Sequence, residues 1–181
     1  MTKNGSIIMG ILIALLLLFT TGCNLSDGDS PPTKYAIGDT GPSGVGIVFY
    51  VTDGGLHGLE VSTVDQSTFS EWSNITDEEI GTTGEAIGTG FLNTDAIIGQ
   101  AGHTDSVAQI CRNYRAVEEG DWFLPSKDEL NAIWENLVDD GSGGNSGVGG
   151  FAERIYWSSS EYNGTIVCCQ WFDDGYKDHT N

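Results

Sequence analysis

The four cysteines are the residues of this chain with the widest range of possible covalent chemistry: lipidation, disulfide formation and nucleophilic attack. Cys23 stands alone near the N-terminus, whereas Cys111, Cys168 and Cys169 lie in the body of the chain. In an oxidising compartment, Cys111 could form a disulfide with Cys168 or Cys169, and three buried thiols are the alternative. Adjacent residues of a strand point to opposite faces, so only one of Cys168 and Cys169 can meet Cys111.

The sequence lacks the spacings that enzymes and metal sites require. No histidine pair lies three or four residues apart, as a shared metal face would need, and no Gly-x-Ser-x-Gly elbow occurs. Ser158, Ser159 and Ser160 have no base nearby in sequence and are more typical of hydroxyls that stabilise turns. We therefore predict no catalytic residues and no metal site. The three isolated histidines are His57, His103 and His179.

The N-terminus has the pattern of an export signal with a lipid-modified cysteine. Lys3 precedes an apolar run from Ile7 to Phe19, which is too short for a good membrane-spanning helix. Small residues follow at 20–22, directly before Cys23. This pattern resembles a bacterial lipoprotein signal, with Cys23 as the lipidation site and residues 1–22 removed. Asn24, rather than aspartate, follows Cys23 and favours an outer-membrane location.

Composition and charge restrict the partners. The chain has 7 basic and 26 acidic residues, and Lys3 is the only charged residue before Cys23, so residues 23–181 carry a formal net charge of −20. Such a surface repels phosphate backbones and sulfated polysaccharides, which excludes nucleic acid and disfavours sulfated glycosaminoglycans. Residues 23–34 are polar, contain Pro31-Pro32, and are expected to form a flexible tether.

Residues 35–181 predict one loop-rich α+β domain with an antiparallel sheet and two to three helices. A hairpin is expected from 46–51 and 59–64 around the turn at 53–55. Helices are expected at 92–98, from Thr104 through Tyr114, and from Ser126 to Val138, the last beginning with a capping box. Trp122–Leu124 should be extended and buried, and two strands should follow at 155–159 and 165–172. The glycine-rich stretch at 141–150 is a loop, because it lacks the strand and helix of a nucleotide site.

Several motifs together resemble the Lcl-type C-terminal domain family from about Gly38 to Gly175. The most specific are Trp122-Phe-Leu-Pro-Ser-Lys-Asp-Glu-Leu130 and Tyr156-Trp-Ser-Ser-Ser-Glu161, supported by Gly41-Pro-Ser-Gly-Val-Gly-Ile-Val-Phe-Tyr50. The resemblance implies a variant of the C-type lectin-like fold in a bacterial surface protein. The last strand of that family, rich in Val-Arg, has no counterpart before Asn181, so either the fold closes differently or the sheet keeps an exposed edge.

Four residues are candidates for ligand binding. Trp157 and Trp171 could form an aromatic platform, but Trp157, like Phe172, also stands where a strand needs a core residue. Glu161 and Asp173, at strand ends, could bind a ligand or calcium, although the spacing matches no calcium loop and solvated acids are the simpler interpretation.

The sequence therefore predicts an exported, lipid-anchored envelope protein with a non-catalytic binding or adhesion domain. Its ligand would be a glycan, a peptide or a partner protein. A structural envelope lipoprotein without a small ligand is the alternative. A thiol or metal enzyme on a fold like that of formylglycine-generating enzymes is the weaker one.

Overall fold

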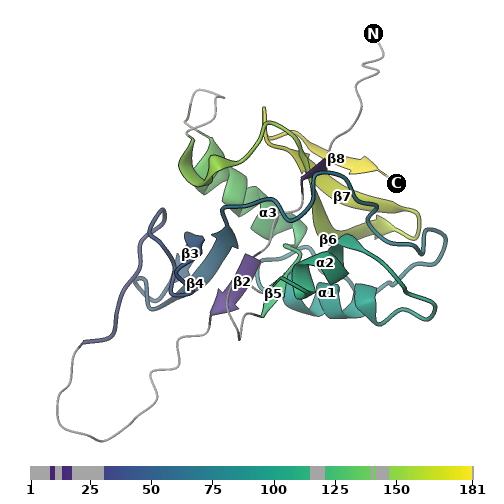
Figure 1. Cartoon of the computed structure of the whole chain (residues 1–181), viewed down its shortest axis with the longest axis horizontal. Coiled ribbons are helices and arrows are strands. Elements are labelled where there is room, and N and C mark those ends of the chain that lie inside the picture. Colours follow the sequence, from purple (N-terminus) through teal and green to yellow (C-terminus); the bar gives the residue numbers. More distant parts are fainter. Residues whose placement is uncertain are drawn as a thin grey trace, which may run out of the picture.

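The computed structural model describes residues 31–114, 121–139, 141 and 147–180, together with the backbone of residues 9–10 and 14–17 (Figure 1). It combines two small sheets with three α-helices, which confirms the prediction of mixed α and β structure. The strands are β1 (Met9–Gly10), β2 (Ala14–Leu17), β3 (Gly46–Thr52), β4 (His57–Ser62), β5 (Trp122–Phe123), β6 (Ile155–Asn163), β7 (Ile166–Trp171) and β8 (Lys177–Thr180). The helices are α1 (Gly90–Ile98), α2 (Val107–Arg112) and α3 (Lys127–Ile133), which continues into a π-helical turn at Trp134–Val138; a 3₁₀ turn spans Val148–Gly150.

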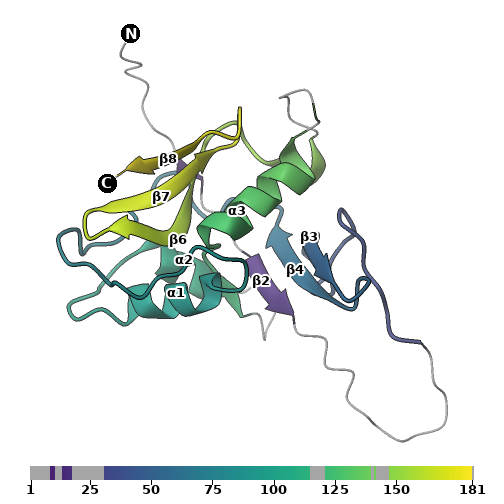
Figure 2. The same cartoon turned by 180° about the vertical axis from the view of Figure 1, so that it is seen from behind.

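The two sheets have the strand orders β1-β6-β7-β8 and β3-β4-β2-β5. Every pairing is antiparallel except that of β1 with β6. Figure 2 shows α3 lying between the two sheets, with α1 and α2 beneath β6. Strand β8 was not predicted, because Lys177–Thr180 is polar and carries no apolar alternation.

The β3–β4 hairpin forms as its sequence predicts. The turn at 53–55 has positive φ at all three residues, and two of them are glycines, which adopt that region at little cost. Strand β4 ends at Ser62 rather than at Val64, because Ser62 turns the chain: its Oγ accepts a hydrogen bond from the Val64 amide at 3.2 Å. A bulge between Val48 and Tyr50 interrupts the pairing.

Helix α3 begins at a capping box, as predicted. The Ser126 Oγ accepts from the Glu129 amide at 3.3 Å, and Glu129 Oε2 accepts from the Ser126 amide at 2.7 Å. The box is entirely buried, and Glu129 Oε1 also accepts from the Gly88 amide at 2.8 Å. The capping box therefore also fastens the loop before α1, a link across 41 residues of sequence.

Helix α2 is shorter than predicted. It begins at Val107 because Ser106, in extended conformation, caps it by accepting from the Gln109 amide at 3.0 Å. It ends at Arg112, so Tyr114 lies beyond the helix, where its ring makes an edge contact with Trp122 at 5.2 Å between centroids.

Two apolar cores share the same strands. Along β5, Trp122 enters the first core and Phe123 the second; along β6, Trp157 enters the first and Tyr156 the second. Alternation of side chains across a strand is the cause. The expectation that Trp157 and Phe172 serve the core is confirmed, since both are buried.

The three described cysteines do not form the disulfide that was one of the two alternatives. Cys111, Cys168 and Cys169 are buried as thiols. Cys169 shares the first core with Cys111, whereas Cys168 belongs to neither core, which agrees with opposite faces of β7. Burial raises the pKa of Cys169 to about 12 and raises the pKa of the other two thiols. None of the three is a ready nucleophile at neutral pH.

A buried carboxyl, that of Glu60, supports the hairpin from the side. Glu60 is 2 % exposed, and the Ser43 hydroxyl and amide donate to its two oxygens at 2.7 and 3.2 Å. A Cβ added at Gly41 or Gly46 would collide with this carboxyl, so the glycines leave the room that it fills. Burial raises the pKa of Glu60, more than the two hydrogen bonds lower it.

The raised pKa predicts that the domain becomes more stable as the pH falls from 8 to 5. A carboxyl whose pKa is higher in the folded than in the unfolded chain takes up a proton on folding. Its stabilising contribution is complete below its ordinary pKa of 4.5 and is lost as the pH rises through the raised value. Thermal unfolding in 0.5 M salt, which screens surface repulsion, should show the midpoint rising toward pH 5. The Glu60→Gln variant should have a flatter profile, and the exposed Glu153→Gln should match wild type; identical profiles for all three would contradict the assignment.

Candidate functional site

The described part of the chain contains an open groove of about 490 Å³. One wall is the irregular segment 69–78, which follows β4 in sequence. The other is the β6–β7 hairpin at residues 163–167, together with Thr180 of β8. The apolar lining residues are Phe69, Trp72, Ile75, Trp157, Ile166 and Val167.

Phe69 is held out at the rim by serine turns. The Ser67 hydroxyl accepts from the Phe69 amide at 3.2 Å and lies 2.9 Å from the Ser70 hydroxyl. Such local bonds to the backbone fix a turn without regular structure. Phe69 is 74 % exposed, the largest exposed fraction among the large apolar side chains described. An aromatic ring presented in this way is available for stacking.

The floor of the groove is made of two buried indoles. The Trp72 Nε1 donates to the Ser158 carbonyl at 2.8 Å, and the Trp157 Nε1 donates to the Ser70 carbonyl at 3.1 Å. Both indole N–H groups are therefore used within the protein. Trp72 and Trp157 are only 9 % and 3 % exposed, so they mainly hold the two sides of the groove together, and the apolar surface open to a ligand comes chiefly from Phe69.

The segment that carries the wall is fastened to α2. Residue Ser73 forms an isolated bridge with Ser106, and the Val107 amide donates to the Trp72 carbonyl at 3.2 Å. The cap of α2 and the wall of the groove are thus one piece of structure.

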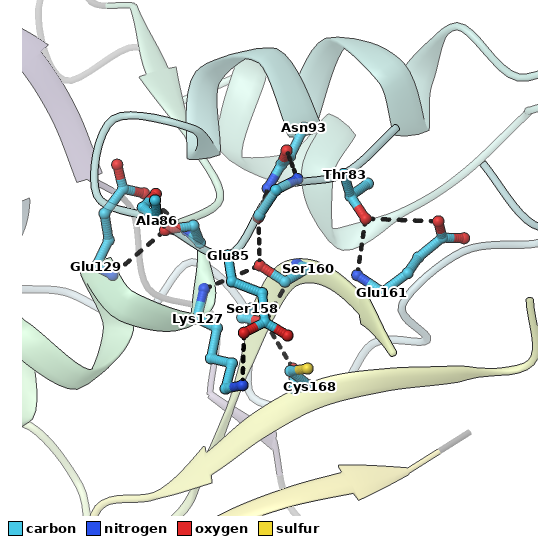
Figure 3. Close-up of polar contacts among 12 residues, drawn as sticks. Thr83, Glu85, Ala86, Asn93, Lys127, Glu129, Ser158, Ser160, Glu161 and Cys168 are labelled. Carbon is cyan, nitrogen blue, oxygen red and sulfur yellow. Dashed lines mark hydrogen bonds and ion pairs between the residues drawn. The ribbon is translucent and has the colours of Figure 1, made fainter. Parts of the chain in front are cut away.

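Glu161 holds the loop at residues 80–83, which follows segment 69–78 in sequence; we call this set of hydrogen bonds the latch. The two carboxylate oxygens of Glu161 accept from the Ile80 and Gly81 amides, each at 3.0 Å, and its own amide donates to the Thr83 hydroxyl at 3.0 Å. Figure 3 shows the Thr83 and Glu161 side chains facing each other. In this structure, the Glu161 carboxylate positions the backbone at residues 80–81.

Behind the groove, the three serines of β6 form a buried polar network, of which Figure 3 shows Ser158 and Ser160. The Ser160 hydroxyl donates to the Gly84 carbonyl at 2.8 Å and accepts from the Lys127 amide at 3.0 Å. The Ser158 hydroxyl donates to the Cys168 carbonyl at 2.8 Å. Each of these hydroxyls is buried and has a hydrogen-bond partner within the protein, so the serines tie β6 to its neighbours; they lie within the strand, whereas the sequence indicated hydroxyls that stabilise turns.

Asn93 joins the same network from α1. Its amide group donates to the Gly84 carbonyl at 2.7 Å and to the Ser159 hydroxyl at 3.0 Å, while its Oδ1 accepts from the Gly84 amide at 2.8 Å. Strand β6 is thereby tied both to α1 and to the loop that Glu161 latches.

The structure brings together two of the four predicted ligand-binding residues. Trp157 and Glu161 line the groove, whereas Trp171 and Asp173 do not. Trp171 packs partly buried against the first core, and Asp173 lies exposed beyond β7. Phe69 and Ile75 also line the groove and were not predicted. Phe69 could have been suspected from the sequence, because it is an aromatic residue among serines in a long loop.

The electrostatic character of the groove is acidic. Its lining includes Glu71, Glu78 and Glu161 and no lysine, arginine or histidine. It therefore disfavours sulfate and phosphate groups and accepts uncharged or cationic ones. Across the described residues, no three histidine, cysteine, aspartate or glutamate side chains gather as a metal would need.

No family model, no curated protein and no solved structure matches this chain. Within the described residues, no helix is both long enough and apolar enough to cross a membrane.

The latch predicts a local effect for Glu161→Ala. Without the carboxylate, the Ile80 and Gly81 amides lose their acceptors, and we expect their hydrogen exchange to accelerate at least tenfold. Since the pair of bonds is partly exposed, the free energy of unfolding should fall by only about 1–2 kcal/mol. The matched control is the exposed Glu153→Ala, which should change neither quantity. Unchanged exchange at Ile80 and Gly81 in Glu161→Ala would show that the latch does not hold this loop.

Proposed function

We propose that this protein is an exported lipoprotein, anchored by lipid at Cys23, whose single domain binds a neutral glycan in the groove between segment 69–78 and the β6–β7 hairpin. The observation that carries the proposal is the groove itself, with an exposed ring at Phe69 above an apolar floor and carboxylates at its edge. The fold of this domain, in the same proposal, is the C-type lectin-like variant that the Lcl-type motifs imply.

The chemistry of the lining supports a glycan. A sugar ring has an apolar face of C–H groups and a periphery of hydroxyls, so it needs a flat apolar surface next to hydrogen-bond acceptors. Phe69 supplies the surface, and the carboxylates of Glu71 and Glu78 can accept from hydroxyls. Because these acids repel anions, sulfated glycosaminoglycans are not part of the proposal.

We propose a non-catalytic role because the side chains that could act as nucleophiles or bases are already hydrogen-bonded or buried within the protein. The β6 serines are buried in hydrogen bonds, and burial holds the thiols protonated. The carboxylate of Glu161 is held by backbone amides.

Phe69 is the residue on which glycan binding should depend. On a glycan array, the protein purified in mild detergent should bind neutral glycans equally with calcium and with a chelator. Phe69→Ala should weaken that binding about tenfold, a loss of about 1.4 kcal/mol. Tyr176→Ala removes an aromatic ring that is 60 % exposed outside the groove and should bind like wild type. Binding of peptides but no glycan would replace the ligand class, and no binding at all would favour a purely structural envelope role.

The anchor is tested separately at Cys23. Cells that produce the wild-type protein should incorporate labelled palmitate into it, and the purified protein should lack residues 1–22 by mass spectrometry. Cys23→Ala should lose the label completely, whereas Cys168→Ala should keep it. Labelling that survives Cys23→Ala, or a mature protein that retains residues 1–22, would rule out the proposed anchor.

A further inference from the structure

Strand β2 occupies the centre of the second sheet, between β4 and β5 (Figures 1 and 2). It pairs antiparallel with both neighbours. Against β4 the register runs from Ala14 opposite Val61 to Leu17 opposite Gly58, and against β5 Ala14 and Leu15 lie opposite Phe123 and Trp122. In the part of the chain that the structure describes, β5 has no other strand partner.

Residues 14–17 belong to the segment that the proposed function removes, and the inference rests on that removal in the cell. When β2 leaves, β4 and β5 face each other at twice the spacing of neighbouring strands, about 9.5 Å. Each then presents a row of backbone N–H and C=O groups to the space between them. Unpaired backbone groups in a buried place carry a substantial energetic cost.

Both flanking strands are held in place by contacts that do not involve β2. Strand β4 pairs with β3 along its whole length. Beyond β5, the Leu124 amide donates to the Thr94 hydroxyl at 3.0 Å, and Ser126 begins the buried capping box of α3. Because these contacts are independent of residues 1–22, the gap is expected to persist as a slot the width of one strand.

The slot requires an apolar occupant. With β2 in place, four consecutive residues of β4, from Leu59 to Ser62, are buried, so both faces of the sheet are covered there in the full-length chain. Trp122 and Phe123 of β5 are likewise buried on opposite faces. A strand buried on both faces is usually apolar at successive positions rather than at alternate ones, unless its polar side chains find partners, as Glu60 of β4 does with Ser43. The tetrapeptide Ala-Leu-Leu-Leu of β2 satisfies this requirement.

We propose that the processed protein is a strand acceptor, in which the slot between β4 and β5 takes one extended apolar segment of a different protein, antiparallel to both strands. Main-chain hydrogen bonds from two sides would supply the affinity, and the apolar surroundings the selectivity. Residues 23–34 are polar with two prolines, and the linkers at 115–120 and 142–146 are also polar, so these segments are poor substitutes for β2. A second processed copy offers only these same polar segments and also lacks residues 1–22, so the occupant is expected to be a different protein.

The test uses the full-length chain, so that it does not depend on processing. Leu16→Pro places a residue without an amide N–H in the middle of β2 and should release it from the slot. Among Gly58–Val61 and Trp122–Phe123, the amides that point toward β2 should then exchange at least tenfold faster than in wild type, whereas the β4 amides that point toward β3 should stay protected. Thr2→Pro, outside the strand, is the matched control and should leave these amides protected. The amides of β8, in the other sheet, report whether the whole domain has unfolded.

A synthetic peptide then tests acceptance from outside. The peptide of residues 13–18 with two lysines at each end, added to Leu16→Pro, should restore the protection and raise the midpoint of thermal unfolding by about 5 °C or more. The same peptide with proline at the position of Leu16 should do neither. If Leu16→Pro unfolds throughout, refolding by the first peptide alone is the supporting result. Unchanged protection in Leu16→Pro, no restoration by the peptide, or equal effects of both peptides would overturn the proposal.

Discussion

The buried hydroxyls of β6 are the constraint on which the rest of the structure depends. Three successive serines lie at the centre of the domain, where a hydroxyl without a partner would cost about 1–3 kcal/mol. Each hydroxyl therefore has a partner on another segment: Ser158 binds the adjacent strand β7, Ser159 binds Asn93 of α1, and Ser160 joins the loop at Gly84 to the start of α3. The two cores that contain residues of β6 are apolar and do not by themselves fix the register of their segments. The row of serine hydrogen bonds, which we call the polar seam, fixes the positions of β7, α1 and the start of α3 relative to β6.

The groove follows from the same seam. The indole of Trp72, from segment 69–78, donates to the Ser158 carbonyl of β6, and the indole of Trp157, from β6, donates to the Ser70 carbonyl of segment 69–78. These two reciprocal hydrogen bonds join the two sides of the groove at its floor. Glu161, the next residue of β6 after the serines, then holds the loop at residues 80–81. A long irregular segment becomes a defined surface because its backbone groups have fixed partners on a regular strand.

Three carboxylates of this acidic chain are stabilised by hydrogen bonds from backbone amides rather than by ion pairs with lysine or arginine. Glu60, Glu129 and Glu161 all accept hydrogen bonds from backbone amides, two of them inside the domain. The ion pairs formed by lysine or arginine in the described residues, Lys127 with Glu85 and Arg112 with Asp95, lie toward the surface. Most of the net charge is thus left at the surface, where it disfavours the approach of anionic groups to the groove.

The sequence by itself determined the elements whose causes are local. The capping box of α3, the glycine turn of the β3–β4 hairpin and the buried extended residues Trp122 and Phe123 were all predicted, because each depends on residues a few positions apart. It also determined the acidic character of the surface. Only the tertiary structure decided that Trp157 and Glu161 share a groove while Trp171 and Asp173 stand outside it, and that the three described cysteines, Cys111, Cys168 and Cys169, are thiols; Cys23 lies outside the described residues. Those outcomes depend on contacts across roughly eighty residues, such as Glu161 with Ile80, and no local pattern encodes which distant backbone amide a buried carboxylate will meet.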